Sequence, residues 1–237
     1  MFVDRFGWYS NRVEKYMEYL RFGNGGTPVI VFPTSGGDHH EFSDRGMVEP
    51  LTWKIDQGLI QLFCIDTNNW EGWYNNDIHP RQRVEKYAKF EEFLIHEFIP
   101  HLWTITGKTN LILFGASFGG YHAINFALKH PELIDKAISL SGSFTIKGLL
   151  DGYYDDLCYF NNPVDYIPNL SDPWFIDMYN SHTELILVSS EQDVCLDRNI
   201  ELANMLRSKN IRHQFIVWDG GHVHDWHTWK EMIGNYV

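Results

Sequence analysis

Several features that would place this chain in a specialised class are scarce or missing. There are three cysteines among 237 residues, and their wide spacing gives neither a zinc-type Cys-x-x-Cys pair nor a disulfide framework. No apolar run approaches the roughly 18 residues of a membrane helix. The N-terminus shows no basic segment followed by an apolar one. We therefore expect a soluble cytoplasmic protein.

Positive charge is also scarce. The chain has 19 Lys and Arg residues against 31 Asp and Glu residues, a formal net charge of −12. An acidic surface repels nucleic-acid phosphates, and no basic amphipathic stretch offers a surface for anionic lipid. We expect no nucleic-acid or membrane partner, and a small substrate that is neutral or cationic. The oligomeric state stays open, with a homo-oligomer as one option.

Aromatic residues, in contrast, are abundant. They make up 16% of the chain, whereas the apolar share of 44% and the charged share of 21% are ordinary for a globular protein. Part of the aromatic excess is expected in the core and part in a pocket or partner surface. The length suffices for one sizeable core, so we predict a single domain over residues 1–237.

Apolar runs alternate with helical patterns along the chain. The apolar runs predict strands over 12–20, 29–32, 60–65, 110–114, 136–141, 184–189 and 212–218. Helical patterns cover 47–57, 81–101, 120–129, 197–209 and 225–237. This alternation predicts an α/β fold, a mostly parallel sheet with helices on both faces. Residues 144–181 show no clear strand, and we predict a small helical insertion there, a lid or pocket wall over the carboxyl edge.

The strongest local motif is Gly115-Ala-Ser117-Phe-Gly119. It fits Gly-x-Ser-x-Gly between a predicted strand and a predicted helix, which is the context that the motif requires. A tight turn would lift the Ser117 hydroxyl above the sheet, beside free N–H groups that favour negative charge. We interpret Ser117 as a nucleophile. The alternative is a glycine-rich turn with a solvated serine.

A serine hydroxyl is a weak nucleophile unless a base takes its proton. The loop after the last predicted strand offers His222 and His224, with His227 a poorer third. Spacing does not choose between the first two. These histidines could also hold a metal, but they lack neighbouring cysteines and a His-Glu-x-x-His pattern, so we expect no metal and no cofactor.

A third residue, an acid, should orient the histidine. Asp193 lies just after strand 184–189, where its loop should face the histidine loop. Glu191 comes a little early, and Asp197 is interpreted as the N-cap of the following helix. The order serine, aspartate, histidine is that of α/β-hydrolases.

The substrate carbonyl needs two preorganised N–H donors when its oxygen becomes negative. We assign one to Phe118 and the other to Gly36, in the glycine-rich loop after strand 29–32, with Ser35 as the fallback. In the same loop, His39 is placed on the pocket rim.

Three aromatic residues follow strand 60–65, at the edge where open α/β sheets bind ligands. Trp70, Trp73 and Tyr74 are predicted to bind substrate, although core packing explains at least one of them equally well.

Two stretches of the chain resemble a known family. Gly115–Gly120, together with Gly220–Trp229, looks like the putative-esterase family of α/β-hydrolases, which includes feruloyl esterases, enterochelin esterases, S-formylglutathione hydrolases and mycolyltransferases. The family pattern of glycines, His, Asp, an aromatic residue and Trp singles out His224 as the base. His222 and Val223 are inserted before it, so His222 stays a rival. The resemblance also supports Asp193 and spans about residues 28–235.

The resemblance implies an α/β-hydrolase fold and acyl-hydrolase chemistry. The sequence thus predicts a serine carboxylesterase that cleaves a small or aromatic carboxylic ester through an acyl-enzyme. An acyltransferase with the same three residues is the alternative, and a non-catalytic binding module on this fold is the third option. The cysteine-containing oxyanion loop typical of S-formylglutathione hydrolases is missing, which argues against that substrate.

Overall fold

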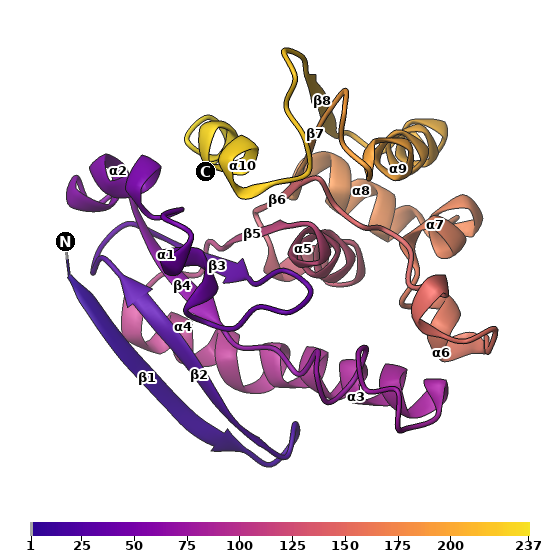
Figure 1. Ribbon diagram of the computed structural model, residues 1–237, viewed down its shortest axis with the longest axis horizontal. Coiled ribbons are helices and arrows are strands. Elements are labelled where there is room, and N and C mark those ends of the chain that lie inside the picture. Colours follow the sequence, from indigo (N-terminus) through magenta and orange to yellow (C-terminus); the bar gives the residue numbers. More distant parts are fainter. Residues whose placement is uncertain (1) are drawn as a thin grey trace.

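A single twisted sheet organises the molecule (Figure 1). The computed structural model describes residues 2–237, and eight strands in this part lie in the order β1-β2-β4-β3-β5-β6-β7-β8. The six strands β3 to β8 run parallel, whereas β1 and β2 form an antiparallel hairpin at one edge. The strands are β1 (Val3–Ser10), β2 (Lys15–Phe22), β3 (Thr27–Phe32), β4 (Ile60–Ile65), β5 (Ile112–Ala116), β6 (Lys136–Leu140), β7 (Glu184–Ser190) and β8 (Gln214–Trp218). The predicted α/β-hydrolase architecture is confirmed.

The N-terminal hairpin corrects the prediction of one strand over residues 12–20. The chain turns at residues 11–14, where Glu14 has a left-handed φ of 58°, and only the second half of that segment belongs to β2. The first strand of the hairpin, β1, was missed. Most of its side chains are exposed because it lies at the sheet edge, so it lacks the apolar alternation of a half-buried strand.

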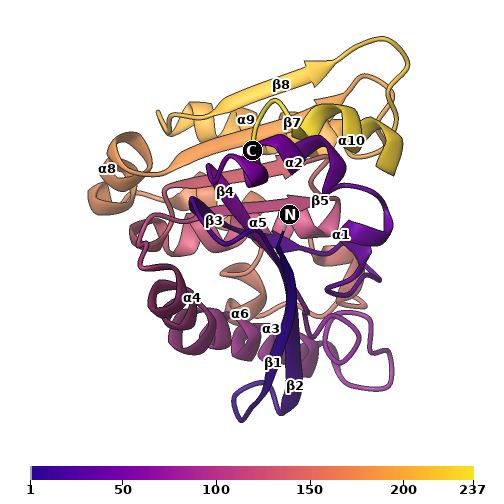
Figure 2. The ribbon, with the colours of Figure 1, turned by 90° about the vertical axis from the view of Figure 1, so that its left-hand side faces the viewer.

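Helices cover both faces of the sheet (Figure 1). One face carries α1 (Glu41–Asp44), α2 (Thr52–Asp56) and α10 (Trp226–Ile233), and the other carries α3 (Pro80–Phe93), α4 (Ile99–Thr106), α5 (Phe118–Lys129) and α9 (Leu196–Ser208). Across residues 2–237, every helix is too short or too polar to cross a bilayer. Figure 2 shows the parallel strands pointing toward one edge, where the chain enters α1 and α10. Functional loops are therefore expected at this carboxyl edge.

The helix predicted over residues 81–101 continues to Thr106. A π-helical turn, Leu94–Phe98, joins α3 to α4 without interrupting the helical path. Pro100 lies in the first turn of α4, where its missing N–H costs little. The predicted end at residue 101 was about five residues too early.

The segment 144–181 is helical, as predicted. It contains α6 (Asp156–Tyr159), α7 (Pro163–Tyr166) and α8 (Pro173–Ser181). These helices contact α3, α9 and β7, respectively, so they extend the layer on the α5 face of the sheet. Its role as a lid or pocket wall stays a prediction.

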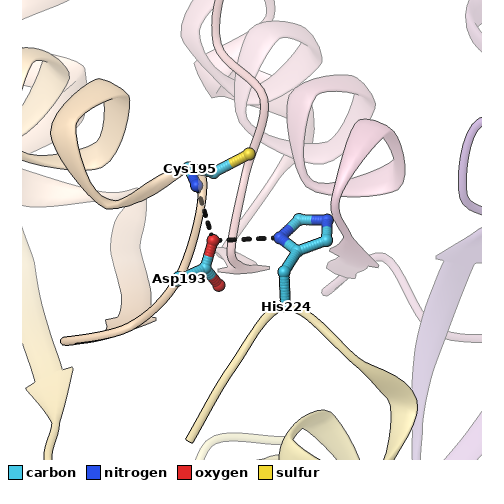
Figure 3. A group of neighbouring side chains, drawn as sticks. All are labelled: Asp193, Cys195 and His224. Atoms are coloured by element: carbon cyan, nitrogen blue, oxygen red, sulfur yellow. Dashed lines mark hydrogen bonds and ion pairs between the residues drawn. The ribbon is translucent and has the colours of Figure 1, made fainter.

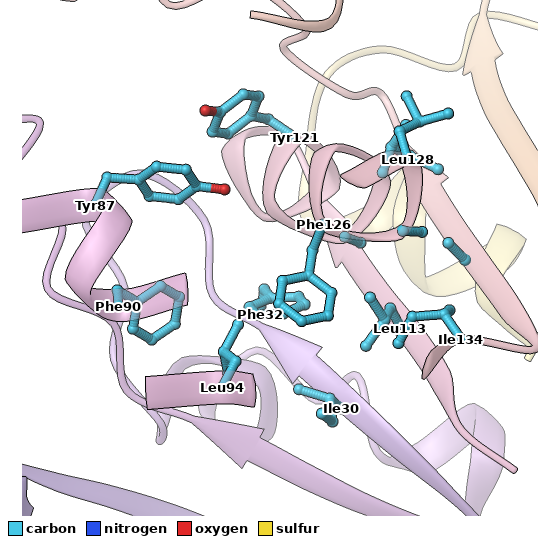
Figure 4. Close-up of a cluster of buried hydrophobic side chains, with 14 of the residues drawn as sticks. Ile30, Phe32, Tyr87, Phe90, Leu94, Leu113, Tyr121, Phe126, Leu128 and Ile134 are labelled. Carbon is cyan, nitrogen blue, oxygen red and sulfur yellow. The ribbon is translucent and has the colours of Figure 1, made fainter. Parts of the chain in front are cut away.

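Helix α5 is the centre of the larger core. Its residues from Phe118 to Leu128 are all buried, because α5 packs between the sheet, α3 and the segment 144–181. Figure 4 shows Tyr87 of α3 facing Tyr121 of α5, with ring centroids 5.8 Å apart, and Phe90 of α3 near Phe32 of β3, at 6.4 Å. Burial of each large apolar side chain contributes about 1.5–3 kcal/mol. The packing holds the N-terminus of α5 rigidly at the carboxyl edge.

One buried group in α5 should make the fold sensitive to acid. His122 is 1% exposed, and its Nε2 lies 3.0 Å from Asn69 Oδ1. Burial lowers the pKa of His122 to about 3. The unfolded chain, with a histidine pKa near 6.5, binds this proton first as the pH falls, so stability is complete above pH 6.5 and is lost below it. The loss should be about 1.4 kcal/mol per pH unit.

Urea unfolding at pH 7.5, 6.5 and 5.5 tests this expectation. His122→Gln should flatten the decrease between pH 6.5 and 5.5, whereas the matched variant His182→Gln, at an exposed position, should retain it. Equal acid sensitivity in wild type and His122→Gln would contradict the assignment to His122.

Candidate active site

Ser117 occupies a strained turn between β5 and α5. Its φ of 54° and ψ of −119° are rare for a residue with a side chain, and such strain is concentrated at functional sites. A Cβ on Gly115 would lie 2.1 Å from the carbonyl carbon of Gly119, and one on Gly119 would lie 2.5 Å from the carbonyl oxygen of Phe32. Both motif glycines are thus required by close backbone packing, which presses the end of β3 against the start of α5.

The structure brings Ser117, His224 and Asp193 into one hydrogen-bonded chain. The Ser117 hydroxyl lies 3.0 Å from His224 Nε2, and His224 Nδ1 lies 2.9 Å from Asp193 Oδ1. Figure 3 shows the second of these contacts. The three residues come from the loops after β5, β8 and β7, so the parallel order of the strands gathers them at the carboxyl edge. A neutral His224 can donate from Nδ1 to the carboxylate and accept the serine proton at Nε2.

The electrostatics of this chain suit proton transfer. The Asp193 side chain is fully buried, and burial alone would raise its pKa, but hydrogen bonds from His224, the Ser141 hydroxyl and the Cys195 N–H together lower it instead. Burial opposes the charged form of His224 as well, but the interactions with Asp193 and with Cys195 together outweigh it and raise the pKa of His224 to about 9. Asp193 therefore stays ionised and stabilises the imidazolium that forms when His224 takes a proton.

The rival histidines are engaged elsewhere. His222 directs Nδ1 to the Asp219 carbonyl and has Nε2 2.9 Å from Glu231. The His227 side chain is 81% exposed and also pairs with Glu231. Both ring nitrogens of His222 thus have partners other than Ser117, which favours His224 on geometric grounds.

Asp197 corrects a prediction. The N-cap of α9 is Cys195, and Asp197 lies within the first helical turn. The helix begins earlier than predicted because the turn that carries Asp193 leads directly into it, with the Leu196 N–H donating to the Asp193 carbonyl at 3.0 Å. The negative charge of Asp197 still stabilises the helix, because it lies near the positive end of the helix dipole.

Residues that follow His224 explain the rest of its motif. The Asp225 side chain accepts from the Thr228 N–H at 2.8 Å and so caps α10. One turn later, the Trp229 ring meets the His224 ring edge-to-face at 4.9 Å, and its indole N–H donates to Ser141 Oγ at 2.9 Å. Trp229 therefore supports the imidazole, a role that spacing along the sequence could not reveal.

The two predicted oxyanion donors lie in neighbouring elements. Phe118 is the first residue of α5, where an N–H has no acceptor within the helix. The loop that carries Gly36 follows β3, whose last carbonyls pack against Gly119. The roles of Phe118 and Gly36, with Ser35 as fallback, stay predictions.

Two carboxylates that the sequence did not reveal hold this loop. Glu41 accepts from the Thr34 N–H at 2.8 Å and from its hydroxyl at 2.7 Å. Asp66, directly after β4, accepts from the His39 N–H at 3.1 Å and has Oδ1 2.6 Å from His39 Nδ1. His39 is 5% exposed, because Asp66 binds its ring on the inner side of the loop, so its place at the pocket rim stays a prediction for a buried side chain.

The three aromatic residues divide between surface and core. Trp70 is 61% exposed and contacts Tyr74, whose ring lies 5.7 Å from that of Phe118. Trp70 also lies beside Gly36, 3.4 Å from where a Cβ would be. Trp73 is 1% exposed and packs against Tyr87, so it belongs to the core and not to a substrate surface. The core alternative is correct for Trp73, because it fills the space between α3 and α5.

Two groups of side chains in the described part of the chain could hold a metal ion. One consists of Asp193, Cys195 and His224, and the other of Glu18, His39 and Asp66. In the second group Glu18 already pairs with Arg5 at 2.7 Å, in addition to the His39–Asp66 contact.

Comparisons with known proteins agree with this geometry. Residues 65–189, just over half of the chain, match the model of the family described as putative esterase. The chain belongs to the putative esterase family. Membership of this esterase family makes the protein an ester-hydrolysing enzyme. No protein with a curated description matches the sequence.

Solved structures show how widely the esterase fold is shared. A ferulic acid esterase is 18% identical to this chain and superposes with a TM-score of 0.79. The match covers 98% of this chain and 94% of that chain. An S-formylglutathione hydrolase from Agrobacterium tumefaciens is 13% identical, with a TM-score of 0.77 and coverage of 98% and 92%. The enterobactin esterase from Shigella flexneri is 17% identical, with a TM-score of 0.67 and coverage of 99% and 58%. At these identities the likeness concerns the fold.

Proposed function

We propose that this esterase is a serine carboxylesterase in which Ser117 is the nucleophile, His224 the general base and Asp193 the residue that orients it. The observation that carries the proposal is the hydrogen-bonded chain from Ser117 Oγ through His224 to Asp193, at 3.0 and 2.9 Å. A strained serine at a helix N-terminus, a histidine within reach and a buried carboxylate behind it form the arrangement that acyl transfer needs.

The reaction proceeds in two steps. Ser117 attacks the ester carbonyl while its proton passes to His224 Nε2, and the imidazolium then gives that proton to the departing alcohol. Water, activated by His224 in turn, cleaves the acyl-enzyme and releases the acid. The N–H groups of Phe118 and Gly36 bind the negative oxygen in both steps, and each such donor contributes about 2.7–4 kcal/mol to transition-state stabilisation.

The substrate class follows from the surface beside Ser117. Trp70 is exposed, and Tyr74 links it to Phe118, so an aromatic wall lies next to both proposed oxyanion donors. A small acyl group or an aromatic ring fits such a wall. The net charge of −12 disfavours anionic substrates. A cytoplasmic location is part of the same proposal and rests on the sequence alone.

A screen of esters tests the substrate class. We expect acetyl and hydroxycinnamoyl esters to be cleaved faster than long-chain esters, with free acid as the product. Trp70→Ala should lower kcat/KM for methyl ferulate about twofold to tenfold, because a ring contact is worth roughly 0.5–1.5 kcal/mol, and should change ethyl acetate hydrolysis less.

Trp53→Ala is the matched control, since Trp53 is similarly exposed but lies on α2. Equal losses in both variants would reject the aromatic wall. New esters formed from added alcohols in place of free acid would reassign the enzyme as an acyltransferase.

A further inference from the structure

A free thiol lies beside the proposed catalytic histidine. Cys195 follows Asp193 by two residues, and its N–H donates to Asp193 Oδ1 at 2.7 Å. Figure 3 shows both side chains on the same side of His224, with the sulfur close to the imidazole. Ligand atoms of Asp193, Cys195 and His224 all lie within 4.8 Å of one another.

We propose that Asp193, Cys195 and His224 form an inhibitory site for a thiophilic divalent cation such as Zn²⁺. The inference rests on the proposed function, because inhibition requires that His224 acts as the base. It adds a means of regulation that neither the hydrolase motif nor the family membership contains.

The donor set matches the chemistry of zinc. Thiolate, imidazole and carboxylate are the three protein ligands that Zn²⁺ prefers, and a site with three of them leaves the fourth position for water. Ligand atoms around a tetrahedral zinc lie about 3.5 Å apart. The atoms lie within 4.8 Å of one another and Nδ1 lies 2.9 Å from Asp193 Oδ1, so an ion requires shifts of about 1 Å in these side chains.

The carboxylate still has coordinating capacity. The Asp193 side chain is fully buried, and its Oδ1 accepts from His224 and Cys195. Within residues 2–237 its Oδ2 makes no close hydrogen bond, and the neighbouring Ser141 hydroxyl helps to lower the Asp193 pKa. An incompletely paired buried oxygen is costly, and a rotation of the carboxylate would turn Oδ2 toward an ion held by Cys195 and His224. The His224 side chain is 21% exposed and provides the route by which an ion enters.

Occupation of the site switches off the base. In the working enzyme Nδ1 carries the imidazole proton and Nε2 is free to accept from Ser117. An ion on Nδ1 forces the neutral ring into the other tautomer, in which Nε2 carries the proton and cannot accept a second one. Binding also releases the thiol proton of Cys195 to solvent. Neither sulfur nor metal changes its oxidation state, so chelation restores activity.

Zinc binding can be measured without catalysis. Competition against a chromophoric zinc indicator with the Ser117→Ala protein should show one site, and adding Cys195→Ala should weaken it at least tenfold. Cys158→Ala is the matched control, because Cys158 is also a buried free thiol but lies in α6, and this variant should bind zinc as the parent does. Co²⁺ bound at the site should show a thiolate-to-cobalt charge-transfer band that disappears only with Cys195→Ala.

Inhibition is measured separately on enzyme with Ser117 intact. Zn²⁺ should abolish p-nitrophenyl acetate hydrolysis, EDTA should restore it, and Cys195→Ala should raise the half-inhibiting concentration at least tenfold relative to that of wild type. Zinc affinity unchanged by Cys195→Ala, or a missing charge-transfer band in wild type, would overturn the site. An inactive wild type that still binds zinc through Cys195 would reject the proposed esterase mechanism and leave the metal site in place.

Discussion

Ser117→Ala is expected to lower kcat for p-nitrophenyl acetate by at least about 10⁴-fold, while the protein remains folded. Alanine removes the only oxygen that can attack from the strained turn, and the backbone conformation of Ser117 is held by the packing of Gly115 and Gly119 and not by the hydroxyl. The small residual rate would come from binding and oxyanion stabilisation. Initial rates, with far-ultraviolet circular dichroism as the folding check, measure the effect.

A fluorophosphonate probe complements the Ser117→Ala measurement. It should label wild type at Ser117 and leave the variant unlabelled. Ser181→Ala, at an exposed position on α8, is the control and should keep both labelling and turnover. Near-wild-type rates in Ser117→Ala would refute the mechanism, and a folded wild type that resists the probe would favour a binding module on this fold.

His224→Ala and His222→Ala form a pair with opposite expected outcomes. His224→Ala should cost about 10⁴-fold or more in kcat, because within residues 2–237 His224 is the one side-chain base in hydrogen-bond contact with the Ser117 hydroxyl. His222→Ala should change kcat by no more than about threefold, since its nitrogens face Glu231 and the Asp219 carbonyl. Both variants are compared by kcat and KM on the same ester.

The pair also decides between the two histidines that the sequence left open. A severe loss in His222→Ala with an active His224→Ala would transfer the role of base to His222.

Asp193→Asn should lower kcat by about 10⁴-fold, a loss similar to that in His224→Ala. The reason is that an amide cannot hold the imidazole in the tautomer that accepts the proton from serine.

The sequence predicted those parts of the site that depend on short segments of backbone, namely the glycine-rich turn at Ser117 and the buried strands that lead to the site. Gly115 and Gly119 had to be glycines for the turn to close, so the motif predicted its own conformation. The buried parallel strands β5, β6 and β7 were found within about two residues of their ends, because a strand buried on both faces is apolar in nearly every position. Asp193 follows one of these predicted strands and His224 follows the last predicted strand, and the carboxyl ends of parallel strands lie at one edge. The sequence therefore predicted that the loops carrying these two residues would meet.

The errors arose where a neighbour distant in sequence decides the environment. His39 was expected on the pocket rim, but Asp66, from another loop, binds its ring and the side chain is buried. Trp73 and Trp70 are three positions apart, but only Trp73 is covered by α3 and α5. The strand β1 exists because β2 supplies hydrogen-bond partners, and no burial pattern marks it.

The amino-acid sequence by itself determined the α/β-hydrolase fold, the reactive turn at Ser117 and the candidate partners Asp193 and His224, because periodicity, glycine placement and chain order are properties of short segments. Only the tertiary structure showed that His224, and not His222, lies within hydrogen-bond reach of Ser117, that His39 and Trp73 are buried, and that Cys195 lies beside the imidazole. Side-chain direction and burial depend on what packs against a residue, and those neighbours are chosen when the loops after β5, β7 and β8 meet at one edge of the sheet.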